Sequence, residues 1–179
     1  MTTIVATSDF IICDRSVGFD CNPEKRKLLE KKYYLDNKGR GVLVHGGYRD
    51  FKRSKDFHQN IFNSVHALSH KTLSSDSEEM DKLLQSVTEL FEKFVSDVMQ
   101  VSDTLYLLTA RHLFIREGKS TTVTVNYPGG VNSYGTGGAL GEAMFLLGLA
   151  PEEIVTEVSK LDPMTSPEFD IFYSKDFAL

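Results

Sequence analysis

Thr2 is the residue whose position offers the simplest chemistry in this sequence. A threonine hydroxyl is a weak nucleophile unless a base takes its proton. The α-amine of a chain that begins with threonine has a pKa of about 7.7–8.0 in water, so it can accept that proton near neutral pH. Removal of Met1 would therefore give Thr2 a nucleophile and a base within one residue. A threonine at position 2 is nevertheless common, and by itself it usually carries no function.

Such a nucleophile needs a cation close to the amine and an acid that holds the cation in place. Asp14 follows the apolar run of residues 10–13 and would lie at the end of a strand. Lys31 and Lys32 begin the next strand-like run. Successive side chains of a strand point to opposite faces, so only one of these two lysines can face Asp14. Lys31 is favoured because it shares a face with Leu35, and Lys32 remains the alternative.

Two glycine-containing turns complete the candidate constellation. Gly46 and Gly47 end an expected strand and precede an expected helix, where free backbone N–H groups are available for an oxyanion. Thr136 lies in the run Gly-Thr-Gly-Gly before another expected helix. That run alone is typical of a tight turn, and it is no Walker loop because no Lys-Ser or Lys-Thr pair follows its second glycine.

The elements that must position these residues follow from hydrophobic periodicity. Period-two and β-branched runs predict strands over residues 2–7, 10–13, 31–35, 41–45, 105–108, 112–116, 121–127 and 169–174. Helical spacing predicts helices over residues 50–69, 80–98, 138–149 and 151–161. Strand hairpins on either side of a helix pair predict an α+β fold, with two sheets faced by two helical layers.

Composition sets the broad class. The 179 residues suit one domain, residues 1–179, and 41% hydrophobic with 25% charged residues is ordinary for a globular protein. A net charge of −5 argues against nucleic acid as the main partner. Cys13 and Cys21 lack a zinc-site pattern, and the spacing of His66 and His70 has no third ligand, so neither a metal nor a cofactor is expected. No leader or membrane-spanning run is recognised, and a reducing cytoplasm suits the cysteine usage.

Taken together and in register, these motifs resemble the proteasome β-subunit family, and most closely the bacterial HslV peptidase branch. Thr2-Thr3-Ile4-Val5 resembles the mature N-terminus, and Asp14 stands where the family has a strand-ending aspartate. Further matches are Lys31 before an apolar strand residue, Gly46-Gly47-x-x-Asp50 at the first helix, the turn around Thr136, and runs in the last helix and strand (residues 152–154 and 170–173). The likeness covers nearly the whole chain. Tyr48 and Arg49 depart from it, since the family usually has small residues there.

The resemblance implies a four-layer αββα sandwich, the N-terminal-nucleophile (Ntn) hydrolase fold, and threonine-type hydrolysis of peptide bonds inside a homo-oligomeric ring. It implies Thr2 as nucleophile, Asp14 and Lys31 as its supporting ion pair, Gly46 as oxyanion donor, and Thr136 in place of an auxiliary serine. Polypeptides would be the substrates, and a separate AAA+ unfoldase is a possible partner.

Two other functions remain open on the sequence. One is a catalytically silent, proteasome-like scaffold or interaction protein, which retention of Met1 would favour. The other is a small-molecule amidohydrolase of the same nucleophile class, with a pocket narrowed by Tyr48. For the ring, we expect apolar surface beyond the needs of one core on the first two helices, at Phe57, Ile61, Phe62, Phe91, Phe94 and Val95. The alternative is that all of these side chains fill a single core.

Overall fold

The computed structural model describes residues 3–17, 27–28, 31–46, 55–69, 77–95, 103–118, 120 and 122–179. Its helices are α1 (Lys55–Ser69), α2 (Ser77–Val95), α3 (Gly138–Leu146) and α4 (Pro151–Leu161), with a final 3₁₀ turn at Ser174–Asp176. Its strands are β1 (Ile4–Thr7), β2 (Phe10–Asp14), β3 (Ser16–Val17), β4 (Lys27–Leu28), β5 (Tyr33–Leu35), β6 (Gly41–Gly46), β7 (Thr104–Thr109), β8 (Leu113–Glu117), β9 (Thr124–Asn126), β10 (Val131–Tyr134) and β11 (Phe169–Tyr173).

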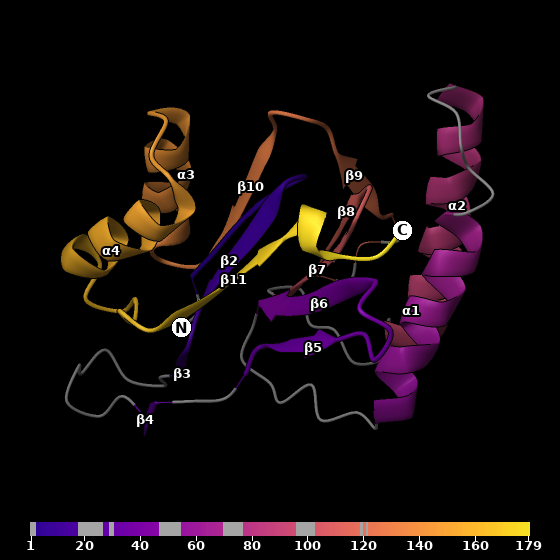
Figure 1. The fold of residues 1–179 in the computed structure, drawn as a ribbon, viewed down its shortest axis with the longest axis horizontal. Helices are drawn as coiled ribbons and strands as arrows, with labels where there is room; N and C mark the ends of the chain where they lie inside the picture. Colours follow the sequence, from indigo (N-terminus) through magenta and orange to yellow (C-terminus); the bar gives the residue numbers. More distant parts are fainter. Residues whose placement is uncertain are drawn as a thin grey trace.

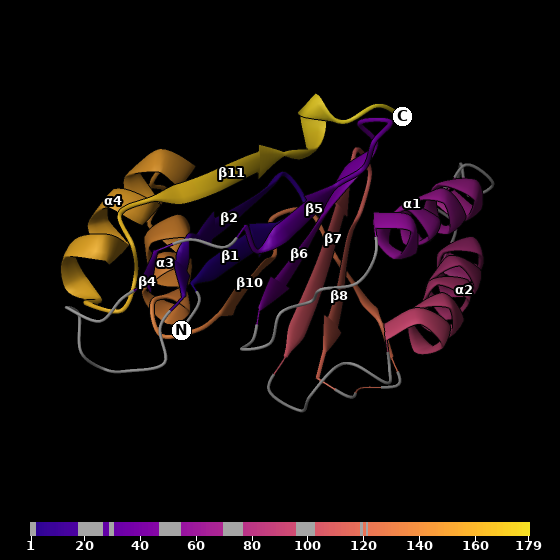
Figure 2. The same ribbon diagram turned by 90° about the horizontal axis from the view of Figure 1, so that it is seen from below.

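Two antiparallel sheets form the centre of the molecule (Figure 1). One has the strand order β10-β1-β2-β11 and the other the order β5-β6-β7-β8-β9. Figure 2 shows these sheets face to face, with α3 and α4 outside the first sheet and α1 and α2 outside the second. The predicted αββα sandwich is therefore confirmed.

Three apolar clusters hold the four layers together. The first, which includes Ile61, Phe91 and Leu107, lies between the α1–α2 layer and the five-stranded sheet. The second, around Ile11 and Tyr106, fills the space between the sheets. A third cluster packs α4 onto β1 and β2. Each sheet is thus covered on both faces, which explains why β1 and β2 are buried along their whole length.

Two short pieces of sheet differ from the sequence prediction. No strand was predicted over residues 131–134, yet they form β10 and pair with β1 from Ile4↔Tyr134 to Thr7↔Val131. No strand was predicted between residues 14 and 30, yet the two-residue pairing of β3 with β4 lies there.

The expected surplus of apolar surface on the first two helices is absent at the three positions that the structure describes. Ile61, Phe62 and Phe91 are at most 3% exposed and belong to the first cluster. Phe57, Phe94 and Val95 lie outside the described side chains. Exposed leucines occur in the other helical layer instead: Leu140 is 37%, Leu146 68% and Leu147 79% exposed.

Within the described part of the chain, none of the helices combines the length and the apolar character needed to cross a bilayer.

Candidate active site

A buried ion pair joins the end of β2 to the residues before β5. The Nζ atom of Lys32 donates a hydrogen bond to Oδ1 of Asp14 over 2.8 Å. The two side chains are only 5% and 1% exposed. Charges removed from water to this extent are costly unless they are paired, so this contact fixes both side chains in one arrangement.

The lysine of this pair differs from the one favoured on the sequence. Lys31 is exposed, and its Nζ lies over the ring of Tyr33, 5.7 Å from the centroid. Regular strand geometry begins only at Tyr33, so the alternation extrapolated from Leu35 back to Lys31 does not hold. The expected ion pair of Asp14 with Lys31 is therefore wrong, and the alternative, Lys32, takes its place.

Asp14 also holds the backbone next to position 2. The N–H of Thr3 donates to Oδ1 of Asp14 over 2.7 Å, and the N–H of Ser166 donates to Oδ2 over 3.2 Å. One carboxylate therefore ties together the start of β1, the loop before β11 and Lys32. Thr2 itself lies outside the described residues, but its neighbour Thr3 is bonded directly to the acid of the ion pair.

Hydroxyl groups extend the site from Thr3 to Thr136. Thr165 donates its only hydroxyl hydrogen to Oδ2 of Asp162 over 2.7 Å. Its oxygen lies 2.6 Å from that of Thr3, so Thr3 must be the donor in that contact. Thr136 donates to the same oxygen of Asp162, also over 2.7 Å. The chain Thr3–Thr165–Asp162–Thr136 thus links β1 to the turn before α3.

The glycine after Thr136 makes this close approach possible. A Cβ atom at Gly137 would collide with the hydroxyl of Thr165 and would lie 2.7 Å from that of Thr3. The run around Thr136 is therefore both the turn that begins α3 and a close-packed wall of the hydroxyl network.

Sequence reasoning missed three residues that contact the ion pair or the hydroxyl network. Asp162, Thr165 and Ser166 lie between α4 and β11 and are 8%, 1% and 1% exposed. The available signal was local: an aspartate after a helix with hydroxyl residues three and four positions later. It is typical of a helix-ending turn, and Asp162 does accept from the backbone N–H of Met164. Nothing in that pattern indicates that the turn meets the N-terminal strand.

Gly46 is the last residue of β6 and follows His45, which pairs with Lys32. The N–H of His45 donates to the carbonyl of Lys32 over 3.0 Å, which extends the pairing of β5 and β6 up to the lysine. Gly46 is buried and pairs with Thr104 on β7. Gly47, Tyr48, Arg49 and Asp50, on which the expected helix entry and pocket shape depend, lie outside the described residues.

Cys13 precedes Asp14, and its thiol is not activated as a nucleophile. Burial, assisted by the charge of Asp170, raises the pKa of its thiol to about 12. The thiol therefore stays protonated at neutral pH, and protonated thiols are poor nucleophiles.

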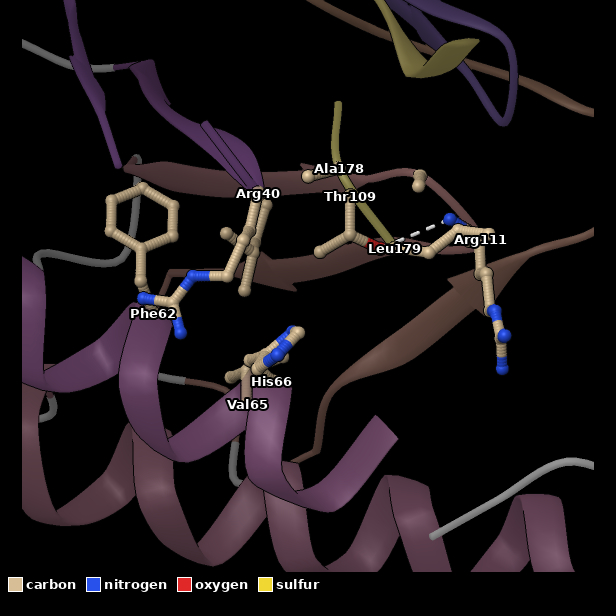
Figure 3. Close-up of a pocket in the computed structure, with 10 residues that line it drawn as sticks. Arg40, Phe62, Val65, His66, Thr109, Arg111, Ala178 and Leu179 are labelled. Carbon is tan, nitrogen blue, oxygen red and sulfur yellow. Dashed lines mark hydrogen bonds between the residues drawn. The ribbon is translucent and has the colours of Figure 1, made fainter. Parts of the chain in front are cut away.

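One cavity of the described chain is remote from this site (Figure 3). About 30 Å³ in volume, it lies between α1, the β7–β8 turn and the C-terminal residues, and Figure 3 shows Arg40, His66, Arg111 and Leu179 around it. It adjoins Thr109, which pairs with Gly41 at the opposite end of β6 from Gly46. Arg40 is held by a buried ion pair with Asp36. The described residues contain no group of three potential metal ligands.

No family model and no curated protein matches this sequence. Solved structures match along nearly the whole chain. HslV from Trypanosoma brucei is 13% identical, with a TM-score of 0.56 over 97% of this chain and 98% of that one. An Anbu (Gly-1) mutant from Hyphomicrobium sp. strain MC1 is 11% identical, with a TM-score of 0.59 over 99% and 84%. Thiobacillus denitrificans BPH in complex with epoxomicin is 13% identical, with a TM-score of 0.52 over 96% of both chains. At these identities the likeness is one of fold, and at that level the resemblance expected from the sequence is confirmed: the chain has the fold of HslV, Anbu and BPH.

Proposed function

We propose that this chain is a threonine-type peptidase in which Thr2, freed of Met1, is the N-terminal nucleophile. The observation that carries the proposal is the buried Asp14–Lys32 ion pair, whose carboxylate also accepts the N–H of Thr3. A cation held next to the α-amine favours the neutral amine, which is the form that can take the hydroxyl proton. In this proposal Gly46, at the end of β6, supplies the backbone N–H for the oxyanion.

The hydroxyl network supports the same assignment. Its donors run from Thr3 towards Asp162, so the first residues of β1 are fixed by both backbone and side-chain contacts. An N-terminal nucleophile needs such fixation, because an error of about 1 Å in its position can lower the rate about 100-fold. In this proposal Thr136 and Asp162 act on the N-terminus through Thr165 and Thr3.

Intact mass and epoxomicin together test the nucleophile. We expect the active protein to lack Met1 and to gain the mass of one epoxomicin, with the adduct mapped to Thr2, because BPH, a structural neighbour, is solved in complex with that compound. The matched control is Thr2→Ala, which should form no adduct. Complete retention of Met1 in protein that cleaves peptides would contradict the mechanism. Met1 retention without peptide cleavage would favour the silent scaffold, and turnover of small amides alone would favour the amidohydrolase.

The proposal includes a closed homo-oligomeric ring that keeps polypeptide substrates, delivered by an AAA+ unfoldase, away from bulk solvent. Its support in this chain is α3, which is apolar on its outer as well as its inner side: Leu140 and Leu146 of the helix and Leu147 directly after it are exposed. Helices with apolar residues all round are usually buried, here against another subunit.

Light scattering at micromolar concentration tests the ring. We expect a mass that is a multiple of the 20.1 kDa chain mass. Leu146→Asp combined with Leu147→Asp should lower that mass, because two charges would be buried in the contact. Leu35→Asp, at a leucine that is 55% exposed on β5, is the matched control and should leave it unchanged. A monomer at all salt concentrations, with peptide cleavage intact, would remove the ring from the proposal.

A further inference from the structure

The ring of Tyr134 occupies the space that a side chain at position 46 would need. A Cβ atom built on Gly46 would lie 2.6 Å from Cδ1, 2.8 Å from Cε1 and 2.9 Å from Cγ of Tyr134. These atoms belong to the near part of the aromatic ring, which cannot move aside without a change in the whole side chain. Gly46 is therefore in direct contact with a residue of the opposite sheet.

The backbone conformation at position 46 does not explain why this residue is a glycine. Gly46 lies within β6, and it is not among the glycines with positive φ, which in the described chain are Gly39, Gly118, Gly129, Gly135 and Gly148. An L-residue would fit the backbone at this position. The requirement for glycine at position 46 comes from the approach of Tyr134.

Tyr134 is held on several sides. It is the last residue of β10 and pairs with Ile4 on β1, two positions from Thr2. Its side chain packs against the cluster between the two sheets. Burial, assisted by the charge of Asp103, raises the pKa of its phenol, so the side chain stays neutral. Asp103 directly precedes Thr104, the β7 partner of Gly46, so the phenol and the glycine share one end of the sandwich.

We propose that Tyr134 is a positioning residue, which sets the location of the Gly46 backbone relative to the N-terminal strand. Because β10 pairs with β1 and the Tyr134 ring lies against β6, one side chain couples the strand that begins after Thr2 to the strand that ends at Gly46. The functional part of this inference rests on the proposed peptidase activity, in which the nucleophile is on the first strand and the oxyanion donor is on the second. The contact itself does not depend on that activity.

A double-mutant cycle in thermal unfolding tests the contact without any substrate. Gly46→Ala should lower Tm by about 5–10 °C, as expected when a methyl group is forced into a packed site. In a Tyr134→Ala background the same change should lower Tm by less than about half as much, because the obstructing ring is gone. Equal effects of Gly46→Ala in both backgrounds would overturn the proposal. If Tyr134→Ala alone does not fold, an unchanged Tm of the single variant Gly46→Ala overturns it and a lowered Tm supports it.

Steady-state kinetics test the positioning role. Tyr134→Ala should lower kcat about 10- to 100-fold with a small change in KM, because a displaced oxyanion donor weakens transition-state binding rather than substrate binding. Tyr134→Phe should restore most of kcat, since it keeps the aromatic ring. Tyr127→Ala, at a tyrosine that is 68% exposed, is the control for a general effect of losing a tyrosine.

The two arms separate failure of this inference from failure of the proposed function. Wild-type protein that hydrolyses no peptide would refute the peptidase, and the thermal cycle would still decide whether Tyr134 sets the position of Gly46. Active protein whose kcat is unaffected by Tyr134→Ala would refute the positioning role and leave the peptidase standing.

Discussion

Replacement of Lys32 by methionine is expected to lower kcat for peptide hydrolysis by about 100-fold or more, because the cation that supports the α-amine and the developing charge is lost. Lys32 is the lysine bonded to Asp14, with its side chain 5% exposed. Methionine keeps an unbranched apolar chain of similar size, and Asp14 keeps its N–H donors from Thr3 and Ser166. The fold should therefore survive, which circular dichroism and Tm would check.

Lys31→Met is the matched control for Lys32→Met. Lys31 is exposed and adjoins Lys32 in sequence, so its replacement should change kcat by no more than about twofold. A large loss with Lys31→Met and a small one with Lys32→Met would contradict the site, because the ion pair seen here would then have no role in turnover. Equal and large losses would indicate a general electrostatic effect rather than a positioned cation.

The choice between these two lysines marks the limit of strand alternation as a guide. The expectation that only one of the two lysines reaches Asp14 agrees with the structure, in which Lys32 is buried and Lys31 exposed. Strand alternation identified the wrong lysine as the buried one, because β5 begins at Tyr33, after both lysines. In addition, Leu35, used as the reference for the inner face, is 55% exposed. A three-residue strand at the edge of a sheet is too short for its pattern to identify the buried face.

Elements with strong apolar periodicity could be predicted, and those stabilised by polar contacts could not. The helix expected over residues 80–98 corresponds to α2, whose stripe packs on the five-stranded sheet. Strand β10 carries Asn132 and Ser133 and was not predicted. In the structure Asn132 accepts a hydrogen bond from the hydroxyl of Tyr106, and Ser133 donates to Glu142. Those partners lie 26 and 9 residues away, so a local pattern does not reveal them.

In the candidate site, too, residues on elements with a strong local pattern could be predicted, and residues brought in by long-range polar contacts could not. Asp14 could be placed at the end of an apolar strand from the sequence, whereas Thr136 was singled out only by the resemblance to the proteasome β-subunit family. Asp162 and Thr165 could not be located, because the hydroxyl contact of Thr165 with Thr3, which joins them to the N-terminal strand, spans 162 residues of chain. Only the closure of β1 against the loop after α4 brings them together.

Removal of the Asp14 carboxylate should cause the largest loss of stability among the site variants. Asp14→Ala leaves the ammonium of Lys32 buried without its partner, and breaking a buried ion pair in this way typically costs about 3–5 kcal/mol. For a chain of 179 residues this corresponds to a fall in Tm of roughly 6–20 °C. Hydrolysis should be lost as well, because the N–H of Thr3 and Lys32 both lose their acceptor.

A second variant separates the charge from the rest of the side chain. Asp14→Ala combined with Lys32→Met removes both charges, and it should regain a large part of the lost Tm while remaining inactive, since an apolar pair avoids the burial of an unpaired ion. The matched control is Glu78→Ala, which breaks a 2.6 Å ion pair between Glu78 and Lys82 on the surface. The side chain of Glu78 is 75% exposed and that of Lys82 is 69% exposed. That change should alter stability by less than about 1 kcal/mol. If Asp14→Ala and Glu78→Ala lower Tm equally, the Asp14–Lys32 pair is solvated in solution, and a buried cation beside the N-terminus can no longer support the proposed nucleophile.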